Sequence, residues 1–293
     1  MRPLSATVLP LCSALGYAFA ALMLKRATEK GVGPWRVSFL TNWMAAAFFT
    51  PWWLASSLPF TWMNVVHAII CGTVFFVGQI FTFLAIVRGD VSVATPVLGT
   101  KVIFVALFAA LLTQERLTPA VWFAAIITAV ATALLGGDKT RSAKHVALSL
   151  GYGFAAAAFF ALTDTLQQRW VQFWGFGHFA ATMFLTIGVL SFGLMPFFSA
   201  PLRAMPASSW RWALAGGAML SIQATGMAYS IATFHEVTVT NILYNTRGIW
   251  SVVLVWVVGH WFGNVEREHG TRVMLRRLIG AALLLSAVFL SVS

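Results

Sequence analysis

Charged residues are scarce in this sequence, and acidic residues are the scarcest. Of 293 residues, 8 are Asp or Glu and 19 are Lys or Arg, so that 9% are charged and 59% are hydrophobic. A soluble domain of this size would carry about 25% charged residues. The mean hydropathy is +0.83, which excludes a soluble globule and predicts an all-α, polytopic membrane protein.

Cysteine is also rare, and the common catalytic motifs are missing. The two cysteines, Cys12 and Cys71, lie inside apolar runs, where they act as small hydrophobic residues. The six histidines are scattered singly, and no HExxH, CxxC, GxSxG or GxxxxGK[ST] occurs. We therefore expect no catalytic residues, no metal site and no cofactor, and the sequence does not indicate an enzyme.

The net charge of +11 reflects basic residues at the ends of apolar runs. A nucleic-acid-binding protein would instead cluster its basic residues on a water-facing element, so nucleic acid is excluded as a partner. Lys and Arg in short loops mark the cytoplasmic side of a membrane protein. Their distribution predicts a multi-pass protein of the cell (inner) membrane with both termini outside and a cytoplasmic loop at 136–145.

Apolar runs of roughly 20 residues, the length that crosses a bilayer, predict about ten transmembrane helices. They are Leu4 to Leu24, Trp35 to Leu54, Asn64 to Val87, Val91 to Thr113, Pro119 to Leu135, Val146 to Leu166, His178 to Ser199, Trp210 to Thr233, Val237 to Gly259 and Val273 to Val292. The basic stretch GGDKTRSAKH separates the halves, with a first unit over 1–137, a linker over 138–145 and a second unit over 146–293.

Two echoes indicate an internal duplication. LGYAFA at 15–20 returns as LGYGFA at 150–155, which also argues that the first helix is retained and is not a cleaved signal peptide. Lys101 in the fourth span aligns with Arg247 in the ninth at an offset of 146 (247 minus 101). Because each half has an odd number of helices, the halves are predicted to be inverted five-helix repeats with a substrate site near the midplane between them.

Lys101 and Arg247 are the strongest candidates for a binding site. Each is the eleventh residue of its predicted span, about 15 Å from either surface at 1.5 Å per residue, too deep to snorkel fully. A charge there costs about 2.5 to 3.5 kcal/mol on insertion scales, so each should face a polar cavity or a partner. The alternative is structural: each cation caps carbonyl groups freed by a helix irregularity, such as Pro96 would cause.

Asp164 is the one acidic residue inside a predicted span. It lies about 27 Å along its helix, whereas Lys101 lies near 15 Å from the same side, so a salt bridge would need a long reach or a broken helix. We therefore predict a central cavity with net positive charge that attracts an anionic or zwitterionic solute. Lys101 would act as a point charge, and Arg247 could hold a carboxylate or phosphate bidentately.

Further polar residues complete the predicted site. Asn241, Tyr244, Arg247 and Ser251 share one arc of the ninth span, and Asn245 lies beside them. The fourth span offers fewer polar groups at the matching positions, so most polar recognition should come from the second half. Buried polar candidates elsewhere are Asn42, Gln79, Asp164 and Gln223, with Tyr17 and Tyr152 in the echoed motifs. Each could equally form an interhelical hydrogen bond.

The stretch from Leu84 to Gly136, LAIVRGDVSVATPVLGTKVIFVALFAALLTQERLTPAVWFAAIITAVATALLG, resembles the third to fifth helices of an EamA-like repeat of the drug/metabolite transporter superfamily. The matching features are the small residues with Pro96 that open the fourth helix and the turn QERLT at 114–118. A weaker second copy ends at 266–292. The resemblance implies a secondary transporter that works by alternating access, with its site between the fourth and ninth helices. Relatives export metabolites or exchange anions, and many keep their termini in the cytoplasm, unlike the orientation predicted here.

The leading hypothesis is an exporter or exchanger of a small anionic or zwitterionic metabolite, embedded in the lipid bilayer as a monomer or homodimer. Facilitated movement or exchange is favoured over proton coupling, because Asp164 is the single buried proton acceptor. A flippase for a lipid-linked anionic head group is one alternative. A non-transporting membrane receptor is another, although it would have no reason to place two cations at matching depths.

Overall fold

The computed structural model describes residues 3–88, 93, 97–113, 116–135, 143–258 and 271–292. Within these ranges all regular secondary structure is helical. The helices are α1 (Leu4–Glu29), α2 (Pro34–Phe49), η1 (Thr50–Ala55), α3 (Trp62–Val87), α5 (Lys101–Phe108), η2 (Ala109–Thr113), α6 (Pro119–Leu135), α7 (Ala143–Val171), α8 (Gly175–Leu190), η3 (Ser191–Phe197), η4 (Leu202–Ala204), α9 (Ala207–Phe234), α10 (Val237–Tyr244), α11 (Arg247–Val258) and α12 (Thr271–Val292).

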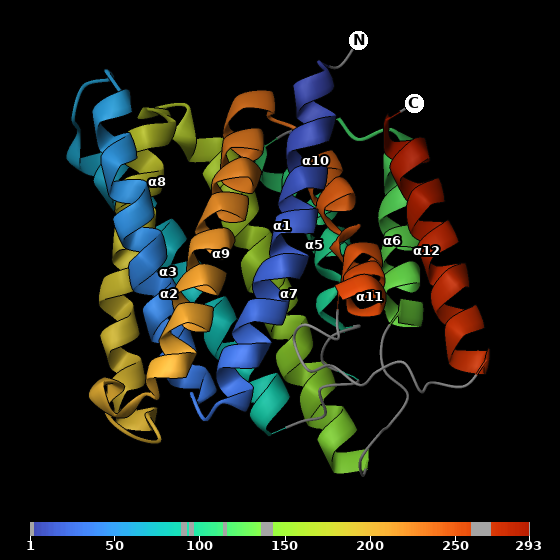
Figure 1. Cartoon of the computed structure of the whole chain (residues 1–293). Helices are drawn as coiled ribbons and strands as arrows, with labels where there is room; N and C mark the ends of the chain where they lie inside the picture. The colour runs from blue at the N-terminus through green and yellow to red at the C-terminus, as the bar shows by residue number, and fades with distance from the viewer. Residues whose placement is uncertain are drawn as a thin grey trace.

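The long helices run side by side, and both chain termini lie at the same end of the bundle (Figure 1). Segments that are far apart in sequence are direct neighbours: α1 packs on α9, α3 on α7, and α6 on α12. The first and second halves of the chain are therefore interleaved in space rather than separate. This arrangement lets side chains from both halves converge on a common interior.

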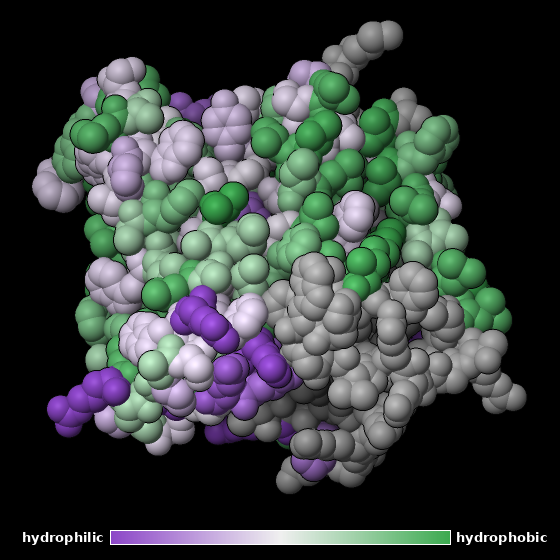
Figure 2. Space-filling view, in the orientation of Figure 1, coloured by the Kyte–Doolittle hydropathy of each residue, from purple (hydrophilic) through white to green (hydrophobic). Residues whose placement is uncertain are grey.

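The outer surface is apolar, as lipid contact requires. In the part of the chain that the structure describes, four helices are long and apolar enough to cross a membrane, and three shorter apolar helices accompany them. The four are Leu4–Glu29, Trp62–Ala85, His145–Val171 and Gly175–Phe197. Bulky side chains such as Leu285 and Phe289 of α12 face outward. Figure 2 shows hydrophobic residues over much of this face and hydrophilic ones gathered toward its lower edge. The total of ten crossings and the five-plus-five division stay predictions.

Local sequence explains several helix boundaries. Pro34 occupies the first turn of α2, where its missing N–H is not needed. Gly31 adopts φ of 88°, a left-handed conformation that suits the tight turn from α1 into α2. Thr61 caps α3 by accepting a hydrogen bond from the backbone N–H of Asn64 at 3.4 Å.

The predicted fourth and ninth spans are not continuous helices. Gly99 and Thr100 form a turn directly before α5, and Asn245 and Thr246 form a turn between α10 and α11. The offset between the two turns is again 146 (245 minus 99), so Lys101 and Arg247 are each the first residue after a break. A straight-helix interpretation of these spans was wrong, because polar and small residues at the two turns interrupt the apolar runs.

Pro96, residues 114–115 of the QERLT turn, residues 138–142 of the linker and residues 266–270 of the weaker second copy lie outside the described residues.

Candidate functional site

A cavity of about 340 Å³ lies within the bundle and is lined by both halves of the chain. Its polar and charged lining residues are Tyr17, Thr41, Asn42, Gln79, Thr82, Lys101, Asp164, Gln167, Gln223, Tyr244 and Arg247. The apolar remainder includes aromatic rings and thioethers, among them Phe75, Phe160, Phe184, Met183 and Met227. Lys101 and Arg247 therefore line the same cavity.

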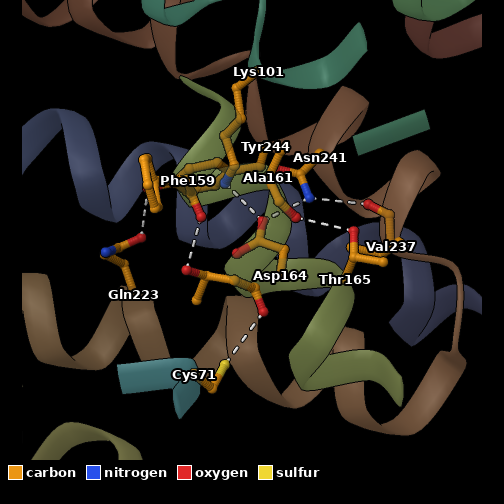
Figure 3. A network of polar contacts seen from close by, with 11 residues as sticks. Cys71, Lys101, Phe159, Ala161, Asp164, Thr165, Gln223, Val237, Asn241 and Tyr244 are labelled. Carbon is orange, nitrogen blue, oxygen red and sulfur yellow. Dashed lines mark hydrogen bonds and ion pairs between the residues drawn. The ribbon is translucent and has the colours of Figure 1, made fainter. Parts of the chain in front are cut away.

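Lys101 and Asp164 form an ion pair at the cavity wall. Lys101 Nζ donates to Asp164 Oδ2 at 2.6 Å, and the side chains are 17% and 13% exposed. Asn241 Nδ2 donates to the same oxygen at 2.8 Å and also to the Val237 carbonyl at 3.0 Å (Figure 3). Asp164 thus holds two donors on one oxygen, which fixes its carboxylate against α5 and α10.

This ion pair corrects the expectation that Lys101 would lack a carboxylate partner. The depth estimate assumed that the fourth span was one straight helix. In the structure the turn at Gly99–Thr100 makes Lys101 the first residue of α5, which packs directly against α7, the helix that carries Asp164. The flexible stem of Lys101 then reaches the carboxylate. Two of the three charges around the cavity neutralise each other.

Arg247 is held by aromatic rings. Its guanidinium carbon lies 4.8 Å from the Tyr17 ring centroid and 4.9 Å from the Tyr244 ring centroid. The two rings contact each other edge to face at 6.0 Å, and Tyr244 donates its hydroxyl to Gln223 Oε1 at 2.9 Å. Among the described residues no carboxylate lies within ion-pair distance of Arg247. Cation–π contacts position the guanidinium and leave its charge unpaired.

Asn42 and Gln79 form a second polar element, a reciprocal amide pair between α2 and α3. Asn42 Nδ2 donates to Gln79 Oε1 at 3.1 Å, and Gln79 Nε2 donates to Asn42 Oδ1 at 3.0 Å. Both side chains line the cavity. Asn42 and Gln79 therefore form interhelical hydrogen bonds and also line the cavity.

Asn42→Ala is expected to lower the free energy of unfolding by about 1 kcal/mol, because Gln79 loses both partners in an apolar interior. The double variant Asn42→Leu with Gln79→Met removes both amides and should recover most of that loss. Thermal unfolding in detergent provides the measurement. A double variant that is less stable than Asn42→Ala would contradict this account of the pair.

Seven of the ten residues predicted for the site line the cavity: Asn42, Gln79, Lys101, Asp164, Gln223, Tyr244 and Arg247. Three do not. Asn241 acts behind the wall by holding Asp164, Asn245 is buried at the turn between α10 and α11, and Ser251 lies on α11 away from the lining. The predicted common arc fails because the helix breaks between Tyr244 and Arg247.

Other lining residues were missed or ranked too low. Tyr17 stacks on Arg247, although its only sequence signal was the repeated LGY motif. Gln167 lines the cavity and donates to the Ala228 carbonyl at 2.8 Å. Of the described polar and charged lining residues, six come from the first half and five from the second, so the lining itself does not favour the second half.

Comparisons with known proteins agree with this architecture. Residues 4–137 match the model of the EamA-like transporter family. The match spans 134 of the 293 residues (137 minus 4 plus 1), and over that stretch the chain is similar to EamA-like transporters. A solved structure described only as "Crystal structure of protein" superposes with a TM-score of 0.78 at 20% identity, covering 99% of this chain and 97% of that one. No curated protein matches with significance.

The family match and the apolar helices support a multi-pass membrane protein, and the matched family is one of transporters. At 20% identity the similar structure supports the shared fold and carries no information on the solute. The chemistry of the site must therefore come from the cavity itself.

Proposed function

We propose that this EamA-like protein is a secondary transporter that moves a small anionic or zwitterionic metabolite, by export or exchange, through the central cavity by alternating access. The observation that carries the proposal is Arg247. Its guanidinium lines the cavity, is held between Tyr17 and Tyr244, and has no acidic partner among the described residues.

An unpaired cation inside an apolar bundle is costly, which marks it as a functional-site candidate by default. A guanidinium carries five N–H donors, and two ring contacts leave donors for a ligand. Those groups match a carboxylate or a phosphate in bidentate geometry. A bound anion would supply the missing counter-charge, so the site is complementary to a negative group rather than to a cation.

The remaining lining residues indicate what the rest of the ligand would be like. Aromatic rings and methionines make up much of the lining, and Met side chains adapt to varied apolar shapes. The Asn42–Gln79 pair and Gln167 add hydrogen-bonding groups. A compact metabolite with one anionic end and a partly apolar body fits this arrangement.

The positions of the two helix breaks support the duplicated, inverted design. The breaks at Gly99–Thr100 and Asn245–Thr246 occur at the same offset, and each places a cation at the cavity. The C-terminal end of α1, which carries Lys25 and Arg26, and the N-terminal end of α9, which carries Arg211, lie at the end of the bundle opposite the termini (Figure 1). Hydrophilic residues gather toward the same edge (Figure 2). We retain the proposal that this end faces the cytoplasm.

The test uses matched pairs of a carboxylate and the corresponding carboxamide across amino acids and monocarboxylic organic acids. A ligand that binds at Arg247 should raise the thermal unfolding midpoint of the purified protein, whereas its carboxamide should not. The same carboxylate should cross the membrane of liposomes that contain the protein and not that of empty liposomes. Equal stabilisation by both members of every pair would exclude an anion-selective site.

A further inference from the structure

Among the described residues, three charged side chains line the cavity, and two of them are paired while the third is not. Lys101 and Asp164 are joined by a 2.6 Å ion pair, whereas the guanidinium of Arg247 lies against two tyrosine rings. All three side chains line the same hollow. The charges of Lys101, Asp164 and Arg247 sum to one net positive charge, and that charge is located on Arg247.

Asp164 already accepts the hydrogen bonds that a second negative group of a ligand would need. Its Oδ2 accepts from Lys101 and from Asn241, so both donors are already engaged by a group of the protein. A ligand with two negative groups would have to draw Lys101 away from Asp164. That step would leave a buried carboxylate beside a second negative charge, which is strongly unfavourable in a site of low polarity.

We infer that Asp164 acts as a charge filter, which admits a ligand with a single negative group and rejects dianions. The inference rests on the proposed function and adds the charge class of the substrate to it. Asp164 is a specificity-determining residue that works through Lys101, and Asn241 positions its carboxylate.

The filter also explains how a zwitterion would be accepted. Asp164 Oδ1 has no hydrogen-bond partner among the described residues, although Oδ2 has two. An ammonium group on a ligand could donate to this free oxygen while its carboxylate binds Arg247. Monoanions and zwitterions both carry a single negative group, so the filter admits both.

The experiment compares probes of equal shape and different charge. Succinamate and 4-carbamoylbenzoate are monoanions, and succinate and terephthalate are the matching dianions. Binding to the purified wild-type protein is measured by calorimetry at neutral pH. We expect each monoanion to bind at least about 10-fold more tightly than its dianion, since one misplaced buried charge exceeds the 1.4 kcal/mol that corresponds to tenfold.

Two variants separate the charge from the shape of residue 164. Asp164→Asn keeps the shape, frees Lys101 for the ligand, and should shift the monoanion-to-dianion ratio toward dianions by about 10-fold or more. The double variant Asp164→Asn with Lys101→Met restores one net positive charge, and its ratio should return to the wild-type value. The ratio is informative even if absolute affinities change.

Different results overturn different claims. Dianions that bind the wild type as tightly as monoanions would refute the filter, whether or not the variants fold, while leaving an anion site intact. An unchanged ratio in Asp164→Asn, or a ratio that stays shifted in the double variant, would refute the role of Asp164. Failure of every monoanion and every dianion to bind the wild type would instead refute the proposed function.

Discussion

Arg247→Ala is expected to lower the affinity for the anionic substrate by about 100-fold. A bidentate contact contributes two charge-assisted hydrogen bonds of about 1.5 kcal/mol or more each, and about 3 kcal/mol corresponds to 100-fold in affinity. Arg247→Lys keeps the charge but loses the planar fork and much of the stacking on Tyr17 and Tyr244, so an intermediate loss of about 10-fold is expected. Equilibrium binding and liposome flux measure both variants.

The fold should survive this change, because no described acidic side chain pairs with Arg247 and would be left without a partner. Arg203→Ala is the matched control: it removes one positive charge from exposed η4, away from the cavity lining. Affinity within about threefold of wild type is expected for Arg203→Ala. The same small effect in Arg247→Ala would remove the basis of the proposed function.

Gly177→Ala is expected to cause the largest loss of stability from a single methyl group. Gly177 lies in the first turn of α8, and a Cβ added there would overlap the backbone carbonyl oxygen of Trp52 in η1. Side-chain rotation cannot relieve a clash with a backbone atom, so α8 and η1 must move apart. Overpacking of this kind costs about 1 to 3 kcal/mol or more. The thermal unfolding midpoint in detergent should fall clearly.

Gly151→Ala is the matched control for this substitution. Gly151 lies within α7, and nothing is found within 4 Å of an added Cβ. Alanine is the better helix former by about 0.5 to 1 kcal/mol, so Gly151→Ala should raise the midpoint slightly. Equal behaviour of the two variants would show that the contact between α8 and η1 tolerates more space than the structure indicates.

The sequence predicted the location of a residue best where a single charged side chain stood in an otherwise apolar run. A cation in an apolar run is rare enough that Lys101 and Arg247 could be assigned to a shared interior from their positions alone, and both line the cavity. The low charge and the high hydrophobicity likewise predicted an all-helical membrane protein. These conclusions depend on the cost of burial, which does not require knowledge of the tertiary packing.

The pairing of these groups could not be predicted, because it depends on where helices break. Lys101 reaches Asp164 only because the chain turns at Gly99–Thr100 and α5 packs on α7. A similar break lies between Tyr244 and Ser251, so these two residues do not share one face of a helix, as the regular spacing of a straight helix predicted. Tyr17 is on the first helix, and its contact with Arg247 arises from the packing of α1 against α10 and α11.

The single unpaired charge of Arg247 has an electrical consequence for the proposed transport cycle. With a monoanion bound, the charges of Lys101, Asp164, Arg247 and the ligand sum to zero. The loaded carrier would therefore switch between its outward-facing and inward-facing states without moving net charge. The empty carrier would move one positive charge, worth about 2.3 kcal/mol for each 100 mV that it crosses. A membrane potential negative inside would thus hold the empty carrier facing the cytoplasm, and it would leave one-for-one exchange of monoanions unaffected.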